Sequence, residues 1–255
     1  MKRIFEITFL TLFIMAAVSI IAAQDTKQTK TKVENVQTRK SAEALFAEGL
    51  KYKQEEQFEK AVQSYKEAIR LKPDYFEAYS NLGNTYWLMK RYKEAEETLK
   101  KAISIKPDSS IPHMILGNVY DDSNRSKEAI EEYKKGIRLE PDQPQIHMEL
   151  GTAYMRLGRN EEAIEEYKET IRLAPEFYEA HFYLGNMYFN AEKVAEAIDE
   201  YKIAISLEPE NPAPHYNVAL AYLAQGSKGK ALDEYKILKD LDKNLANQLF
   251  ERIYK

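Results

Sequence analysis

The feature that most constrains the fold of this chain is a repeat of 34 residues. The stretch YEAHFYLGNMYFNAEKVAEAIDEYKIAISLEPEN, residues 178–211, returns in related form on both sides of itself. Two residue types mark the interval: Pro73, Pro107, Pro141, Pro175 and Pro209, and Gly49, Gly83, Gly117, Gly151 and Gly185. A fixed period of this length is typical of arrays in which neighbouring units cover each other's apolar faces. The sequence therefore predicts a stack of similar units.

Six units can be aligned, over residues 42–75, 76–109, 110–143, 144–177, 178–211 and 212–245. Position 8 of the unit is glycine except at Ala219, position 11 is always tyrosine and position 20 is always alanine. Position 24 is tyrosine except at Leu99, and position 32 is proline until Lys243. Small residues at 8 and 20 let two antiparallel helices approach closely, and the rings fill the space beside that contact. Proline at 32 cannot lie inside a helix and marks the connection to the next unit.

This combination of positions resembles the tetratricopeptide repeat. The resemblance covers residue 42 to about residue 255 and implies an all-α fold, a right-handed α-solenoid of six helix-turn-helix repeats. After the sixth repeat, apolar residues recur at helical spacing and predict a capping helix over 244–254, so the whole solenoid spans 41–255: Leu245, Leu249, Phe250 and Ile253. The resemblance also implies that the partner is a protein or a peptide.

The first helix of each repeat has one stripe, at positions 4, 7, 8 and 11, that is expected to face the second helix. Positions 2, 5, 9, 12 and 13 form another face, which in a curved stack lines the inner concave surface. Asparagines there could bond to a partner's backbone, and large apolar side chains could adapt to its side chains. The predicted partner-binding residues are Asn84, Trp87, Asn118, Met148, Met155, Phe182, Asn186, Phe189 and Tyr216.

Two alternatives remain open for this face. The side chains at position 12 could pack against the neighbouring repeat, and the asparagines could form bonds within the stack. One partner class is disfavoured, because some tetratricopeptide repeat proteins bind the carboxylate end of chaperone tails through Lys and Arg at positions 5 and 9. Neither residue type occupies either position in any of the six units.

The N-terminus predicts export. Lys2 and Arg3 precede an almost wholly apolar run, residues 7–23, so residues 1–23 are interpreted as a signal peptide or as an uncleaved N-terminal membrane anchor. Residues 24–40 are rich in Thr, Lys and Gln and are expected to be a disordered linker. Either interpretation places the repeats in an extracytoplasmic location, periplasmic or secreted, with a possible tether to the inner membrane through residues 7–23.

Composition disfavours several classes of function. The formal charge is −4 without a sustained basic block, so nucleic acid is not an expected partner. The chain has no cysteine, and no catalytic set or phosphate-binding loop is visible, so we expect no enzyme and no cofactor. The four histidines recur at position 4 and resemble a metal ladder: His113, His147, His181 and His215. They are expected to point into the seam between the two helices of a repeat, as structural residues and not as metal ligands.

The sequence thus predicts an exported scaffold that mediates protein–protein interaction by binding a peptide or partner protein along its concave face. The alternative is a membrane-tethered structural or assembly subunit of an envelope complex that acts by self-association, as a homo-oligomer. An enzyme is a remote alternative.

Overall fold

The computed structural model describes residues 40–255, and in this part of the chain all regular structure is helical. Thirteen helices follow one another in it: α2 (Ala42–Gln54), α3 (Phe58–Leu71), α4 (Phe76–Leu88), α5 (Tyr92–Ile105), α6 (Ser110–Asp122), α7 (Ser126–Leu139), α8 (Pro144–Arg156), α9 (Asn160–Leu173), α10 (Tyr178–Asn190), α11 (Val194–Leu207), α12 (Pro212–Ala224), α13 (Lys228–Leu241) and α14 (Lys243–Tyr254). The six predicted helix pairs and the capping helix are confirmed.

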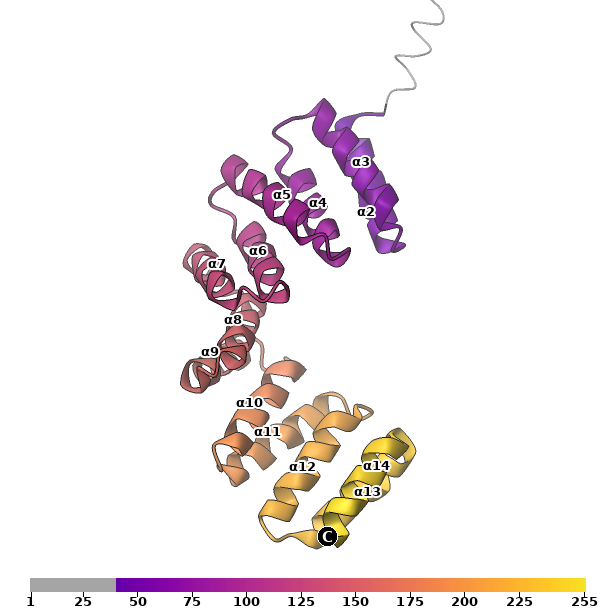
Figure 1. Ribbon diagram of the computed structural model, residues 1–255, viewed down its shortest axis with the longest axis vertical. Coiled ribbons are helices and arrows are strands. Elements are labelled where there is room, and N and C mark those ends of the chain that lie inside the picture. The colour runs from indigo at the N-terminus through magenta and orange to yellow at the C-terminus, as the bar shows by residue number, and fades with distance from the viewer. Residues whose placement is uncertain (1–39) are drawn as a thin grey trace, which may run out of the picture.

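The helix pairs stack into a curved array with a hollow on one side (Figure 1). Each helix contacts the next one in the chain, and α14 closes the array against α12 and α13. In the middle of the array α6 and α8 lie toward the hollow, while α7 and α9 lie on the outer edge. The first helices of the repeats therefore form the inner layer, as the helical geometry predicts.

A left-handed residue turns the chain between the two helices of every repeat. It falls at position 15, where the backbone φ is between 57° and 77° in all six units: Glu56, Lys90, Asn124, Gly158, Glu192 and Gly226. Such a residue commonly ends a helix, because it lets the next amide groups bond back to the last carbonyls. Only two of the six are glycine, so this turn is not visible in the sequence as a glycine signal.

The glycine at position 8 faces the ring at position 24. A β-carbon added to Gly185 would lie 2.7 Å from Cε1 of Tyr201, and one added to Gly151 would lie 2.8 Å from Cε1 of Tyr167. Tyr167 and Tyr201 are almost completely buried. Repeat 6 carries Ala219 instead, and its ring, Tyr235, is only partly buried. The small residue therefore decides how deeply the ring can enter the seam.

The two ends of the array differ in how they are covered. Position 10 contacts the preceding repeat, so Thr85 is fully buried, whereas the equivalent Lys51 of repeat 1 is exposed. At the other end α14 buries Leu249 and Ile253 against repeat 6. Phe250 belongs to the same sequence stripe but points outward with 45% of its surface exposed.

The N-terminal predictions fall almost entirely outside the described residues. These are the signal peptide or anchor over 1–23 and the linker over 24–40, of which only residue 40 is described. From residue 40 to residue 255, no helix has the length and apolar character required to cross a membrane.

Candidate functional site in the inner face of repeats 4 and 5

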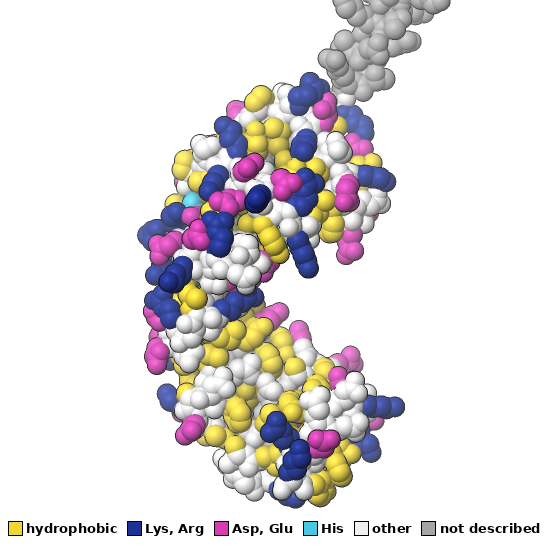
Figure 2. Space-filling model, viewed as in Figure 1, with side chains coloured by type: hydrophobic (Ala, Val, Ile, Leu, Met, Phe, Trp, Pro, Cys, Tyr) yellow, Lys and Arg dark blue, Asp and Glu magenta, His cyan; other side chains and the backbone are white. Residues whose placement is uncertain are grey.

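The nine predicted partner-binding residues lie on the first helices of repeats 2–6. Met148 is buried and the other eight are partly buried, so none of them is fully displayed to solvent. The space-filling view shows the hollow beside them, with hydrophobic side chains gathered along its lower half (Figure 2). Whether these residues bind a partner stays a prediction.

Two of the predicted asparagines are bonded within the stack. The hydroxyl of Tyr133 donates to Oδ1 of Asn118 at 2.7 Å, and that of Tyr201 donates to Oδ1 of Asn186 at 2.8 Å. Asn217 of the next repeat also donates to Asn186 at 2.8 Å. In both repeats the bond fixes the ring at position 24 to the inner helix.

At position 12, the alternative of packing against the neighbouring repeat is realised in two places. Trp87 donates its indole N–H to Oδ2 of Asp122 at 2.8 Å, across the boundary between repeats 2 and 3. Asp121, with only 5% of its surface exposed, accepts from Ser126 at 2.6 Å and pairs with Arg156 of repeat 4 at 2.8 Å. These polar links therefore tie the inner helices of repeats 2, 3 and 4 together.

The spacing of the inner helices changes between repeats 4 and 5. Among the successive first helices of the six repeats, α4 and α6 lie closest along their backbones, and α8 and α10 are the least close pair. Among repeats 2–6, repeat 5 carries the bulkiest side chains at positions 6 and 10, Tyr183 and Met187. Tyr183 stacks on Tyr167 with 5.9 Å between ring centroids. Large side chains therefore stand at the boundary where the inner helices are least close.

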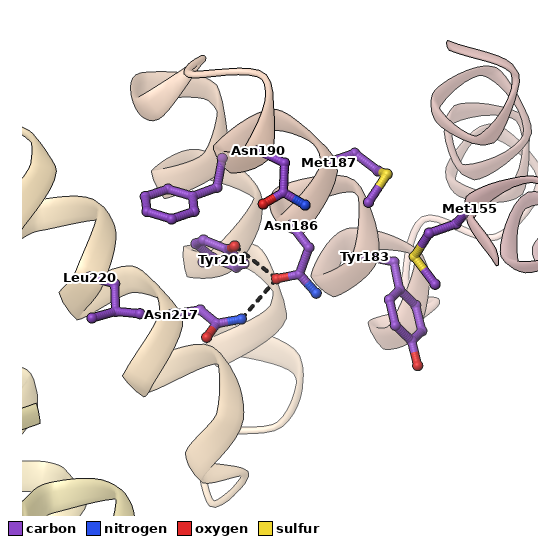
Figure 3. Close-up of a pocket in the computed structure, with 9 residues that line it drawn as sticks. Met155, Tyr183, Asn186, Met187, Asn190, Tyr201, Asn217 and Leu220 are labelled. Atoms are coloured by element: carbon purple, nitrogen blue, oxygen red, sulfur yellow. Dashed lines mark hydrogen bonds between the residues drawn. The ribbon is translucent and has the colours of Figure 1, made fainter. Parts of the chain in front are cut away.

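A cavity of about 440 Å³ lies at this boundary and is lined by residues of repeats 4, 5 and 6. Figure 3 shows side chains from α8, α10, α11 and α12 around it, with Asn186 in the middle bonded to Tyr201 and Asn217. The lining is mostly apolar or aromatic: Met155, Tyr183, Asn186, Met187, Phe189, Asn190, Tyr201, Asn217 and Leu220. Three of the predicted residues, Met155, Asn186 and Phe189, are thus brought together in one site.

A second cavity, of about 320 Å³, adjoins the first one at Tyr183, which lines both. Its other walls mix apolar and charged side chains: Gln145, Met148, Glu149, Thr152, Arg156, Phe177 and Glu179. Burial, together with the charges of Asp121 and Asp122, raises the pKa of Glu149, and Arg156 only partly offsets them. We call the two cavities together the repeat 4–5 groove.

Sequence reasoning missed Tyr183, Met187 and Glu149. All three are at positions 6 and 10, beside the predicted inner stripe and toward the preceding repeat. Tyr183 and Glu149 are partly buried and Met187 is buried, but all three line the groove. Size is a signal for two of them, because Tyr183 and Met187 are larger than the residues at the same positions in repeats 2, 3, 4 and 6.

The histidines point into the seam between the helices of their repeats, as predicted. In each case Nδ1 lies 2.6–2.7 Å from a glutamate of the second helix, in the pairs His113–Glu132, His147–Glu166, His181–Glu200 and His215–Glu234. In the last three, Nε2 also lies 2.8–3.0 Å from the carbonyl oxygen of the preceding repeat's proline.

At His147 and His181, two acceptors per ring favour the imidazolium, which alone can donate from both nitrogens. Burial would lower the pKa of His147 and His181, but the glutamate and carbonyl acceptors outweigh it and raise that pKa above 6.5. Over residues 40–255, no group of three or more metal-binding side chains converges. The histidine series is therefore a set of structural bonds that also connects successive repeats.

The fold resembles several solved structures. A chain of the APC/C hetero-tetramer Cut9–Hcn1 is 18% identical with a TM-score of 0.70; the match covers 84% of this chain and only 43% of that one. Pseudomonas aeruginosa pilF is 18% identical with a TM-score of 0.74 and coverages of 83% and 96%. YrrB, described as a TPR protein with an unusual peptide-binding site, is 21% identical with a TM-score of 0.62 and coverages of 74% and 99%. No curated protein matches the sequence.

Family models match most of the repeat region. A TPR repeat model matches residues 49–90 and 117–158, and tetratricopeptide repeat models match residues 76–109, 149–212 and 188–246. The same residues form the helix pairs, with glycine against ring in the seam and proline at the connections. The chain belongs to the tetratricopeptide repeat family.

Proposed function

We propose that this chain is an exported scaffold that holds another protein by binding an extended segment of it along the inner face of the repeats. The observation that carries the proposal is the repeat 4–5 groove. Side chains from repeats 4, 5 and 6 form the walls of its larger cavity. The volume of this cavity, as bounded by residues 40–255, is about 440 Å³. A site of this size suits one or two apolar side chains of a partner.

The chemistry of the lining supports a protein ligand. Met155 and Met187 are flexible and polarisable, so they can adapt to side chains of different shape. Phe189 and Tyr183 offer aromatic surface, which is enriched at the centres of protein interfaces. The peptide-binding site for which YrrB is described shows that a similar array can serve this purpose.

Photo-crosslinking tests the proposal directly. A photoreactive amino acid at Asn190, which is exposed and lines the larger cavity, is expected to capture a partner protein in intact cells. The matched control is the same amino acid at Lys202, which is exposed on the second helix of the same repeat. Capture at both positions or at neither would contradict binding in the groove.

Truncating the groove provides an independent check. Met155→Ala combined with Phe189→Ala is expected to reduce capture from Asn190 strongly, because both side chains form walls of the larger cavity. Helicity measured by circular dichroism is expected to stay close to that of the wild type, since both residues are only partly buried. Unchanged capture by a folded double variant would remove the groove as the binding site.

Export is the second part of the proposal and rests on the apolar run over residues 7–23 behind a basic start. N-terminal sequencing of the mature protein distinguishes a cleaved signal peptide from a retained anchor. A mature chain that starts near residue 24 supports cleavage. A full-length chain in the soluble cytosolic fraction would contradict export.

One observation favours the alternative of self-association. On α14, Phe250 and Tyr254 form an exposed ring pair with 4.6 Å between centroids, at the end of the array. Exposed aromatic rings at the end of a stack could contact a second copy. Sedimentation of the purified chain tests this, and the expected result for a self-associating subunit is an oligomer that Phe250→Ser dissociates.

A further inference from the structure

The smaller cavity of the repeat 4–5 groove contains a carboxylate without a partner. Over residues 40–255, Glu149 takes part in no hydrogen bond or ion pair, although it is partly buried. The carboxylate oxygens of Glu149 are not sealed from solvent, so they are open to a cation or a hydrogen-bond donor that enters the cavity. A partly buried carboxylate gains more from such a partner than a fully exposed one does.

In the described part of the chain, none of the neighbouring charged side chains is bonded to the carboxylate of Glu149. Arg156 lines the same cavity, but its guanidinium is bonded to Asp121. Asp121 and Asp122 add negative charge close by, and Glu179 is exposed at the cavity wall. Burial, followed by the charges of Asp121 and Asp122, raises the pKa of Glu149, and a cation placed beside the carboxylate would oppose this effect.

The excess of acid extends along the predicted inner face. Acidic side chains there outnumber basic ones, with Glu43, Glu77, Asp121, Asp122 and Glu179 against Lys53 and Arg156, and Glu149 lies beside this face. A partner segment with positive charge is therefore favoured over a negatively charged one.

The shape of the smaller cavity limits what the cation can be. Met148, Phe177 and Tyr183 form apolar or aromatic walls beside Glu149. A lysine or arginine side chain fits this arrangement, because its aliphatic stem can lie along the apolar walls while its charged end reaches the carboxylate. Among the described residues no three carboxylates or histidines converge as a metal site would require.

We propose that the repeat 4–5 groove recognises an extended segment of a partner protein that places a lysine or arginine against Glu149 and Glu179 and an apolar side chain in the larger cavity. The two side chains lie on either side of Tyr183, the residue shared by both cavities. This inference rests on the proposed function and specifies the chemistry of its ligand.

Labelled peptides test the inference on the full mature chain. The probes are eight-residue fluorescent peptides of Gly and Ser that carry one leucine and, two residues away, lysine, norleucine or glutamate. We expect the lysine peptide to bind about tenfold more tightly than the norleucine peptide, and the glutamate peptide more weakly than both. Fluorescence anisotropy at constant ionic strength measures the three affinities.

The key variant is Glu149→Gln combined with Glu179→Gln. Glu149 has no partner to lose, so the fold is expected to be retained, and the preference for lysine over norleucine is expected to disappear. The control is Glu77→Gln, which removes the acid at position 2 of repeat 2 in the same way that Glu179→Gln does in repeat 5. This control is expected to keep the preference.

Three results would overturn the inference. The first is equal binding of the lysine and norleucine peptides, which would leave the groove as a purely apolar site and the proposed function intact. The second is binding of none of the peptides while crosslinks still form at Asn190, which would mean that the groove binds a partner segment without the proposed pair of a basic and an apolar side chain. The third is self-association of the wild-type chain that Glu149→Gln abolishes, because the occupant would then be the lysine-rich segment 24–40 of another copy. Failure of the crosslinks as well would instead remove the proposed function.

Discussion

In repeats 3 and 5 the tyrosine at position 24 donates its hydroxyl to the asparagine at position 9, whereas repeats 1 and 2 each contain only half of this pair. Repeat 1 has Tyr65 opposite Leu50, and repeat 2 has Asn84 opposite Leu99. In consequence the hydroxyl of Tyr65 and Oδ1 of Asn84 are buried without a hydrogen-bond partner among the described residues. The histidine–glutamate pair follows the same division, since it occurs only in repeats 3–6.

This difference shows that the backbone is the same in all repeats, whereas the hydrogen bonds between side chains are not. All six repeats have the same helix pair, the same left-handed turn and the same small residues in the seam. Only repeats 3–6 add bonds between the two helices that depend on specific side chains. The 34-residue pattern thus gives the same fold with and without these polar pairs, and we expect the pairs to add to the stability of the repeats that contain them.

The largest expected contrast concerns the histidine pairs. Glu200→Ala leaves Nδ1 of the buried His181 without its acceptor, and we expect a loss of about 1–3 kcal/mol in the free energy of unfolding. Thr98 is the residue at the same position in repeat 2 and bonds only to a backbone carbonyl of its own helix. Thr98→Ala is expected to change stability by less than about 0.5 kcal/mol.

Urea unfolding followed by circular dichroism measures both variants. Equal losses for the two substitutions would mean that the histidine pairs add nothing to the seam. They would then be a by-product of the pattern and not a source of stability.

The tyrosine pairs give the next largest contrast. Tyr133→Phe removes the donor to Asn118 and is expected to cost about 1 kcal/mol in unfolding free energy. Tyr65→Phe removes a hydroxyl that has no partner among the described residues and is expected to be neutral or slightly stabilising. The same unfolding measurement applies, because both rings stay in place.

A substitution that adds the missing asparagine to repeat 1 tests the same comparison in the opposite direction. Leu50→Asn offers an acceptor to Tyr65 at the position where repeats 3 and 5 carry asparagine, and Leu50 is already 40% exposed. We expect a gain of about 0.5–1 kcal/mol. A loss of stability in Leu50→Asn together with a large cost of Tyr65→Phe would refute the view that repeat 1 lacks this bond.

The smallest expected effect is a dependence on pH. Because the pKa of His147 and His181 is raised in the folded chain, their contribution to stability is complete below the ordinary value of 6.5 and declines as pH rises through the raised value. The decline is small, since a neutral ring can still donate one hydrogen bond to its glutamate. Unfolding free energies measured between pH 6 and pH 8 are expected to fall for the wild type.

The matched variant combines Glu166→Gln with Glu200→Gln and removes the carboxylates that raise the two pKa values. Its stability is expected to stay level or to rise over the same pH range, because burial then favours the neutral rings. A parallel decline in wild type and variant would assign the pH dependence to other groups.

Most of the fold could be predicted from the sequence because one 34-residue pattern is repeated six times. Each unit confirms the others, so the helix pairs, the proline connections and the direction of the histidines follow from spacing alone. Phe250 shows the limit of such patterns, since it shares the spacing of Leu249 and Ile253 and yet points outward.

The candidate site could be predicted only in part. The inner stripe included Met155, Asn186 and Phe189, which line the larger cavity. It did not include Tyr183 or Glu149, which lie at position 6, beside the stripe. The repeats share a backbone pattern, but side-chain volume and charge at position 6 differ from one repeat to the next, so the pattern does not predict where the cavities form.

The wider spacing of α8 and α10 has a mechanical consequence. Repeats 1–4 lie on one side of this gap, and repeats 5 and 6 with α14 lie on the other. A small rotation at this boundary would displace the two ends of the array by a larger distance, so the width of the groove and the curvature of the whole array would change together. A partner bound at Tyr183 would therefore also influence the distance between the two ends of the molecule.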